Sequence, residues 1–112
     1  TGAGDEVYVE SQDGMLVSMS KYRETLGPGI AGELVGISKI SRELFSLMLN
    51  IAQNKFKQSL QFDYETDCLV AAARNWAIAC PVINGLVWAE IDDAAHLERA
   101  LRDIYPKLRR DS

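Results

Sequence analysis

An aromatic side chain and two carboxylates occupy alternate positions in the last third of the chain. On a β-strand, Trp88, Glu90 and Asp92 would point to the same side, because successive side chains alternate between the two faces. Ligands bind at the carboxyl ends of strands in open α/β sheets. Mg²⁺ typically takes one or two carboxylates and completes its shell with phosphates and water. The spacing therefore indicates a site for Mg²⁺ and a phosphorylated ligand.

The same segment also has a purely structural interpretation. Asp92 or Asp93 directly precedes an apolar helical pattern, and aspartate is a preferred helix N-cap. On the residues alone, capping is the commoner role, although one aspartate could serve both purposes. His96, the only histidine, lies in the helix that follows. Its position favours a surface or packing role over that of a catalytic base.

The first part of the chain predicts a hairpin and a third strand. Residues 6–10 alternate acidic and apolar side chains as a half-buried strand does, and residues 13–14 (DG) are a hairpin turn signal. Residues 15–21 are the expected return strand. A loop containing glycine and proline follows at residues 22–31, and residues 33–40 predict a buried strand.

Helices and two further strands are expected next. Ser41 is a suitable N-cap for a helix with a broad apolar stripe, which continues to Phe56. Residues 64–76 have apolar side chains at helical spacing and predict a second helix. The segments 78–83 and 86–91 predict short strands, and Pro81 indicates that the first is an edge strand or irregular.

A last helix is expected to begin at Asp92 or Asp93. The helical pattern runs to about Arg109, but Pro106 would strain the final turn, so an earlier end near Tyr105 is the alternative. Its apolar side chains form a single stripe of Leu97, Leu101, Ile104 and Leu108. The order of all these elements predicts an α/β or α+β layered domain, with helices packed on a mixed sheet.

Composition limits the classes of function. The chain has 112 residues, 47% of them hydrophobic and 25% charged, which suits one globular domain. Sixteen acidic and twelve basic residues give a net charge of -4, which argues against nucleic-acid binding. No apolar run approaches the roughly 20 residues that cross a bilayer. No signal-peptide pattern is present and the chain has two cysteines, so we expect a cytoplasmic protein and no membrane partner.

Three segments, in this order, resemble one family of enzymes. They are residues 32–41 (GELVGISKIS), 64–67 (YETD) and 88–100 (WAEIDDAAHLERA). From about Glu6 onward, the chain is similar to the C-terminal half of nucleotidyltransferases that couple a nucleoside triphosphate to a sugar phosphate or a small phospho-alcohol. The cytidylyltransferases acting on phosphocholine or 2-aminoethylphosphonate have a GE-x-VGI-x-K-x-S strand, a YED-type helix start and a W-x-EID segment in this order.

The resemblance implies a partial Rossmann-like nucleotidyltransferase fold and a set of site residues. It assigns Asp92 to the catalytic Mg²⁺, and it assigns Lys21, at the end of the second strand, to the acceptor's phosphate. Around the acceptor pocket it places Glu33, Tyr64, Glu65 and Trp88, with Glu90 beside them or facing solvent. An aromatic face beside a carboxylate suits a choline or aminoethyl cation. The family more often has threonine after the metal-binding aspartate, where this chain has Asp93.

Each of these residues also has a simpler interpretation. Lys21 would be an ordinary solvated lysine at a strand end. Tyr64 and Trp88 would pack in the core or at a helix start. Cys68 and Cys80 have no basic neighbour in the sequence and are expected to be small core residues.

The resemblance also determines what we expect of the whole protein. Residues 1–112 would form a single domain, the acceptor-binding C-terminal portion of a nucleotidyltransferase whose N-terminal nucleotide-binding half is absent. Residues 1–4 (TGAG) are too short for the family's glycine-rich triphosphate loop, so this chain alone is expected to be inactive. The chain begins with threonine, which suggests a piece of a longer protein.

The expected partners follow from the same resemblance. In the full-length enzyme they are a nucleoside triphosphate, with CTP favoured, and a small phospho-alcohol, phosphonate or sugar-phosphate acceptor. A homo-oligomer, or association with the missing half, would cover strand edges that are left open. The alternatives are a non-catalytic binding or oligomerisation domain that reuses the fold, and a small-molecule sensor that has lost the chemistry.

Overall fold

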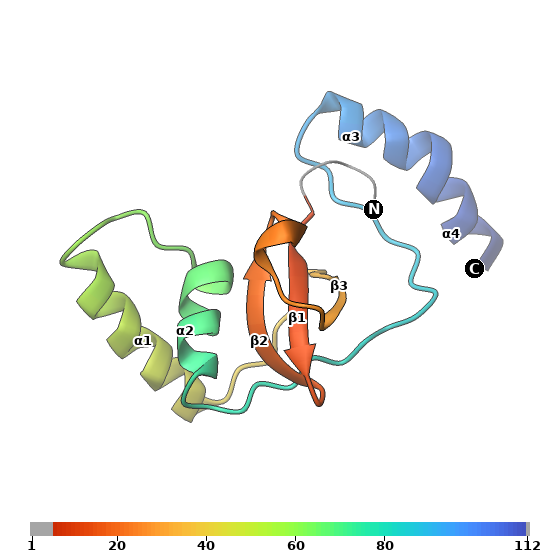
Figure 1. Ribbon diagram of the computed structural model, residues 1–112. Coiled ribbons are helices and arrows are strands. Elements are labelled where there is room, and N and C mark those ends of the chain that lie inside the picture. The colour runs from red at the N-terminus through yellow and green to blue at the C-terminus, as the bar shows by residue number, and fades with distance from the viewer. Residues whose placement is uncertain (1–5, 112) are drawn as a thin grey trace. The chain divides into compact units, whose positions relative to one another are not determined.

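The computed structural model describes residues 6–111, in two compact units (Figure 1). One unit is Val7–Val82, and the described part of the other is Glu6 with residues 83–111. The segment 1–4, considered above as a phosphate loop, lies outside the described residues. The protein is a mixed α/β structure with helices and a three-stranded sheet. Both strand pairs of this sheet are antiparallel, so the mixed sheet that was predicted is not found in the described residues. No helix in the described residues is long and apolar enough to cross a membrane.

The sheet has the strand order β2-β1-β3 and begins with the predicted hairpin. Strand β1 (Tyr8–Gln12) pairs with β2 (Met15–Ser20) on one side and with β3 (Ile30–Glu33) on the other. Asp13 and Gly14, between the first two strands, have positive φ angles of 53° and 78°. Two consecutive positive φ angles are what a tight hairpin turn requires, so the turn prediction is confirmed.

Helix α1 (Arg42–Phe56) begins where the sequence predicts. The Ser41 hydroxyl oxygen accepts a hydrogen bond from the backbone N–H of Leu44 at 3.1 Å, which confirms the N-cap. Leu44 and Met48 on one side of the helix are buried. They join a core formed with sheet residues and the next helix, whose buried members are Val9, Leu16, Met19, Leu44, Met48, Cys68, Leu69 and Ala72.

The second helix starts with a π-helical segment, Tyr64–Leu69, and continues as α2 (Val70–Ala73). The Asp63 carboxylate caps it by accepting hydrogen bonds from the N–H groups of Glu65 at 2.6 Å and Thr66 at 2.8 Å. The predicted start is confirmed, but the helix ends at Ala73 and not at Trp76. The N–H groups of Arg74 and Asn75 donate to carbonyl oxygens three residues earlier, so the α-helical pattern gives way to turns after Ala73.

The predicted strand at residues 33–40 is displaced toward the N-terminus. Strand β3 begins at Ile30, within the segment expected to be a loop, and ends at Glu33. The expected loop also contains the 3-10 helix Arg23–Thr25. Gly36 has a φ of 86°, a left-handed conformation that a regular strand does not use, so it prevents extension of β3.

The predicted strand at residues 86–91 is wrong, and the irregular strand expected at residues 78–83 is reduced to a single bridge. Only Ala79 makes an isolated antiparallel bridge, with Met15. The pairing stops at Cys80, whose N–H donates to the Gly14 carbonyl oxygen at 2.8 Å, and the next residue is Pro81, which has no N–H. Residues 86–91 have no regular secondary structure. No strand of the described chain pairs with them, and an apolar alternation without a partner does not make a strand.

The C-terminal helix continues through Pro106. It consists of α3 (Ala94–Arg99), a π-helical turn (Ala100–Ile104) and α4 (Tyr105–Asp111). Of the two predicted ends, the one near Arg109 agrees with the observed end at Asp111 to within two residues, and the earlier one near Tyr105 is wrong. The N–H of Tyr105 donates to the carbonyl oxygen of Ala100, five residues earlier. This wider turn relieves the collision that a proline ring makes with the carbonyl four residues before it.

Candidate functional site

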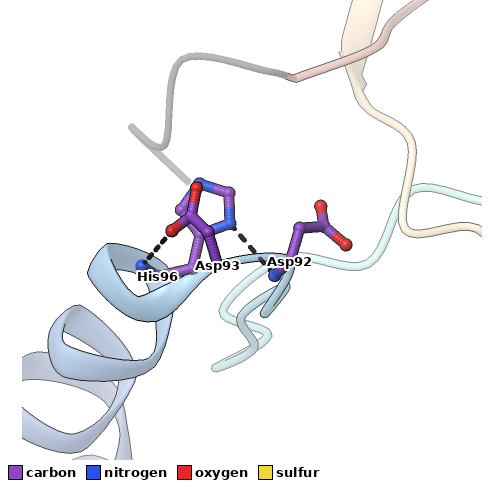
Figure 2. Close-up of polar contacts among 3 residues, drawn as sticks. All are labelled: Asp92, Asp93 and His96. Atoms are coloured by element: carbon purple, nitrogen blue, oxygen red, sulfur yellow. Dashed lines mark hydrogen bonds and ion pairs between the residues drawn. The ribbon is translucent and has the colours of Figure 1, made fainter.

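The first turn of α3 shows which of the two aspartates caps the helix. Asp93 has extended backbone angles, and its Oδ1 accepts a hydrogen bond from the backbone N–H of His96 at 2.8 Å (Figure 2). The N–H of Leu97 donates to the Asp93 carbonyl oxygen at 3.1 Å. Asp93 is therefore the N-cap, and the choice that the sequence left open is resolved in its favour.

The side chain of Asp92 is not needed to start the helix. Its carboxylate is exposed and has no hydrogen bond or ion pair with any residue that the structure describes. In Figure 2 it points away from the His96 ring. The backbone N–H of Asp92 donates to Nδ1 of His96 at 3.3 Å. The segment before α3 is therefore held by its backbone, and the Asp92 carboxylate remains available to a ligand.

His96 has a specific role that the sequence analysis missed. Its side chain is only 14% exposed, and its Nε2 lies 3.8 Å from Oδ2 of Asp93. At the third helical position, His96 acts like the glutamate of a capping box, because its side chain reaches back to a backbone N–H before the helix. It reaches Asp92, one residue beyond the cap. The signal in the sequence is a histidine three residues after a capping aspartate.

The metal prediction depends on Asp92 alone. Within residues 6–111, no group of three or more His, Cys, Asp or Glu side chains is placed to hold a metal ion. One free carboxylate is compatible with Mg²⁺, which is often bound through one or two carboxylates together with substrate phosphates and water. It is not sufficient for metals that need several protein ligands. The chain's own contribution to such a site would be the Asp92 carboxylate.

The other residues assigned to this part of the site are not arranged as on a strand. Trp88 is half-buried and Glu90 is exposed, in a segment without regular structure. The prediction of a strand here is wrong. The strand geometry that would point Trp88, Glu90 and Asp92 to the same side is therefore absent. All three lie in the unit that contains α3.

Lys21 and Glu33 lie in the other unit, at one end of the sheet. In the sheet register, Tyr8 at the start of β1 is opposite Ser20 on one side and Glu33 on the other. Lys21 follows Ser20 directly and is exposed, whereas Glu33 is half-buried. Because β1 separates them, the two backbones are about two strand spacings apart, roughly 10 Å. The structure thus places a cation and a carboxylate at the same end of the sheet.

Tyr64 and Glu65 begin the π-helical segment. The Oε2 atom of Glu65 is buried and has no hydrogen-bond partner among the described residues. A Cβ atom at Gly36 would lie 4.0 Å from this oxygen, so the carboxylate reaches the loop that follows Glu33. Burial raises the pKa of the Tyr64 phenol, and the neighbouring Glu65 carboxylate raises this pKa further. A π-helical turn is itself a frequent feature of functional sites.

A buried carboxylate oxygen without a donor is energetically unfavourable. Leaving such a group unsatisfied typically costs about 1–3 kcal/mol. Glu65 lies against Gly36, in the loop that follows Glu33, and Tyr64 is its neighbour in the chain.

Neither cysteine has the character of a nucleophile. The Cys68 thiol is buried and donates to the carbonyl oxygen of Met48 at 3.3 Å. Burial raises the pKa of the Cys68 thiol, and the Asp67 carboxylate raises it further. Burial also raises the pKa of Cys80. Both side chains therefore remain protonated near neutral pH, which fits the expected role of small core residues.

No known protein-family model matches the chain.

Proposed function

We propose that this chain is the acceptor-binding part of a nucleotidyltransferase with a partial Rossmann-like fold. The whole enzyme would transfer a nucleotidyl group, with CTP favoured as the donor, to a small phosphorylated or phosphonate acceptor. The residues proposed to contact the reacting groups are Asp92 and Lys21. Those proposed to hold the acceptor are Glu33, Tyr64, Glu65, Trp88 and Glu90.

The proposed reaction is a single displacement at phosphorus. An oxygen of the acceptor's phosphate or phosphonate forms a bond to the α-phosphorus of the triphosphate. The bond between this phosphorus and the bridging oxygen breaks, and pyrophosphate leaves with the electron pair. Mg²⁺, when bound, would neutralise negative charge on the phosphate oxygens. No covalent enzyme intermediate is needed, which is consistent with the protonated thiols of Cys68 and Cys80.

The observation that carries the proposal is the different use of two adjacent aspartates. Asp93 caps α3, whereas the carboxylate of Asp92 has no partner among the described residues. The ordinary structural reason for an aspartate before a helix thus applies to Asp93. The Asp92 side chain has no such structural role among the described residues, and this is what we expect of a carboxylate that binds a ligand.

The acceptor half of the proposal is supported by Lys21 and Glu65. The exposed ammonium group of Lys21 at the sheet end could neutralise the acceptor's phosphate. The negative charge of the half-buried Glu65 could attract the acceptor's positively charged group. Tyr64, which is 56% exposed, offers an aromatic face next to it. These groups have the chemistry needed for a small zwitterion with an anionic and a cationic end.

The test uses the full-length protein encoded by the reading frame that contains this chain. Pyrophosphate release is measured with CTP, Mg²⁺ and either phosphocholine or 2-aminoethylphosphonate. We expect Asp92→Asn to lower kcat by roughly 100-fold or more, as when an electrostatic stabiliser is removed. The matched control is Asp93→Asn, which keeps a side-chain oxygen for capping and should leave kcat within about twofold, since Asn and Asp are comparable caps.

Two results would count against the proposal. One is the absence of pyrophosphate release with every small phosphorylated acceptor tested. The other is an equal loss of activity in Asp92→Asn and Asp93→Asn, which would mean that the aspartates act only through the helix start.

A second function is favoured by one observation, the exposed apolar side chains on α1. Phe45, Leu49 and Phe56 are 57%, 47% and 46% exposed, although Leu44 and Met48 on the adjacent side of the helix are buried in the core. Such a face suits a non-catalytic binding or oligomerisation domain. Sedimentation equilibrium with and without Mg²⁺ and CTP distinguishes the two functions. An assembly domain would form a stable oligomer that depends on neither, and Phe45→Glu would dissociate it.

A further inference from the structure

A hollow of about 380 Å³ lies in the unit Val7–Val82, between the last turn of α1 and the helix that begins at Tyr64. Its volume is within the range of small-ligand pockets, about 300–1,000 Å³. None of the residues assigned above to the nucleotidyltransferase site lines it. The hollow is therefore a separate feature whose chemistry has to be explained by its own side chains.

The charges in this hollow are mainly positive. Lys55 and Arg74 line it, both are exposed, and neither forms an ion pair with a residue in the described part of the chain. The hollow also contains one carboxylate, Asp67, whose Oδ2 accepts a hydrogen bond from the backbone N–H of Asp63 at 2.9 Å. The lining thus contains two positive side chains and one negative side chain, although the chain as a whole has a net charge of -4.

The rest of the lining has an apolar part and neutral hydrogen-bonding groups. Phe62, Val70 and Ala71 are half-buried and give an apolar surface. The Phe62 ring makes an edge-to-face contact with Phe56, with 5.9 Å between the ring centroids, which limits its movement. Amide and hydroxyl donors are added by Gln58, Ser59, Gln61 and Thr66.

We infer that this hollow binds an organic phosphate monoester with an apolar body. The body lies against Phe62, Val70 and Ala71, and the phosphate is held by Lys55 and Arg74 with the neutral donors around them. The charged side chains of the lining have a net charge of about +1, so a doubly charged phosphate is attracted more strongly than a singly charged carboxylate. Guanidinium and ammonium groups are the usual side-chain partners of phosphate.

The probe is phenyl phosphate, added to the ¹⁵N-labelled 112-residue chain at low salt, with amide chemical shifts as the readout. We expect saturable shifts at Thr66, Ala71 and Arg74, and no such shifts with phenol, which has the same ring without the charge. Lys55→Gln and Arg74→Gln should each weaken binding about threefold or more, the effect of removing one exposed charge contact. Asp67→Asn should tighten binding, since the amide oxygen can still accept from Asp63.

The matched control is Lys57→Gln, which removes the same charge two residues from Lys55 but from a side chain that does not line the hollow. It should leave the affinity for phenyl phosphate unchanged within experimental error. Equal weakening by Lys55→Gln and Lys57→Gln would show only diffuse attraction and overturn the inference. Absence of saturable shifts with phenyl phosphate, or equal shifts with phenol, would overturn it as well.

Discussion

The backbone N–H of Asp92 donates a hydrogen bond to Nδ1 of His96, with 3.3 Å between the two nitrogen atoms. In the opposite direction, the backbone N–H of His96 donates to the Asp93 carboxylate. A ring nitrogen accepts only when it carries no proton. This arrangement therefore fixes both the orientation of the imidazole and the backbone immediately before α3, without using the carboxylate of Asp92.

Replacing His96 should loosen this backbone. In His96→Leu the N–H of Asp92 loses its acceptor, whereas in His96→Gln the amide oxygen replaces it, as in a capping box. A single hydrogen bond is worth about 1 kcal/mol, so amide hydrogen exchange at Asp92 should become roughly fivefold faster in the leucine variant. Equal exchange rates in the leucine and glutamine variants would show that the ring nitrogen does not hold the segment.

Removing the cap of α1 should lower stability. Ser41→Ala deletes the oxygen that accepts from the Leu44 N–H, and we expect the free energy of unfolding to fall by about 1 kcal/mol. Urea denaturation followed by circular dichroism measures this change. Ser38→Ala is the matched control, because Ser38 is exposed and lies outside the helix. A comparable loss in the control would mean that the effect is not due to capping.

Gly36 should not tolerate a side chain well. Its φ of 86° is a left-handed conformation, which costs an ordinary residue roughly 1–2 kcal/mol. Gly36→Ala should therefore lower the unfolding free energy by about this amount, while Gly36→Asn should lower it less, since asparagine enters this region more readily. A Cβ atom would lie 4.0 Å from Oε2 of Glu65, an ordinary contact, so the cost arises from the backbone. Equal effects of alanine and asparagine would contradict this explanation.

Changing Glu65 should lower the pKa of Tyr64. Burial is the largest cause of the raised pKa and the charge of Glu65 comes next, so in Glu65→Gln the pKa should fall while it remains above the ordinary tyrosine value. NMR titration of the Tyr64 ring signals measures this change. The pKa of Tyr64 is higher in the folded state than in the unfolded state. The neutral phenol therefore adds to the free energy of unfolding below about pH 10, and this contribution is lost as the pH rises through the folded-state pKa. An unchanged Tyr64 pKa in the variant would show that Glu65 is not one of its causes.

The features that were predictable from the sequence depend on a few neighbouring residues. The turn at Asp13 and Gly14 and the cap at Ser41 are local, because each requires only backbone angles or a hydrogen bond within a few positions. The start of the second helix at Tyr64 is of the same kind. Such elements form wherever these residue types occur in the right order.

The failures concern features that depend on a partner or on a backbone irregularity. Residues 86–91 alternate as a strand would, but strand formation requires a neighbouring strand, which cannot be read from the segment itself. Pro106 indicates a helix end only if the turn before it is an ordinary α-helical one. In the candidate site, the two aspartates were correctly identified as alternatives for the cap, but only the hydrogen bond from His96 to Asp93 distinguishes them.

The π-helical turn before Pro106 also changes the surface of the C-terminal helix. An additional residue in one turn rotates everything after it by roughly 100° relative to a continuous α-helix. Leu97 and Leu101, which are 46% and 58% exposed, therefore do not share a line with Leu108, which is 46% exposed. The apparent single stripe in the sequence becomes two short faces with different directions. A straight helical partner could match only one of them, so complete coverage requires a partner that bends or two different partners.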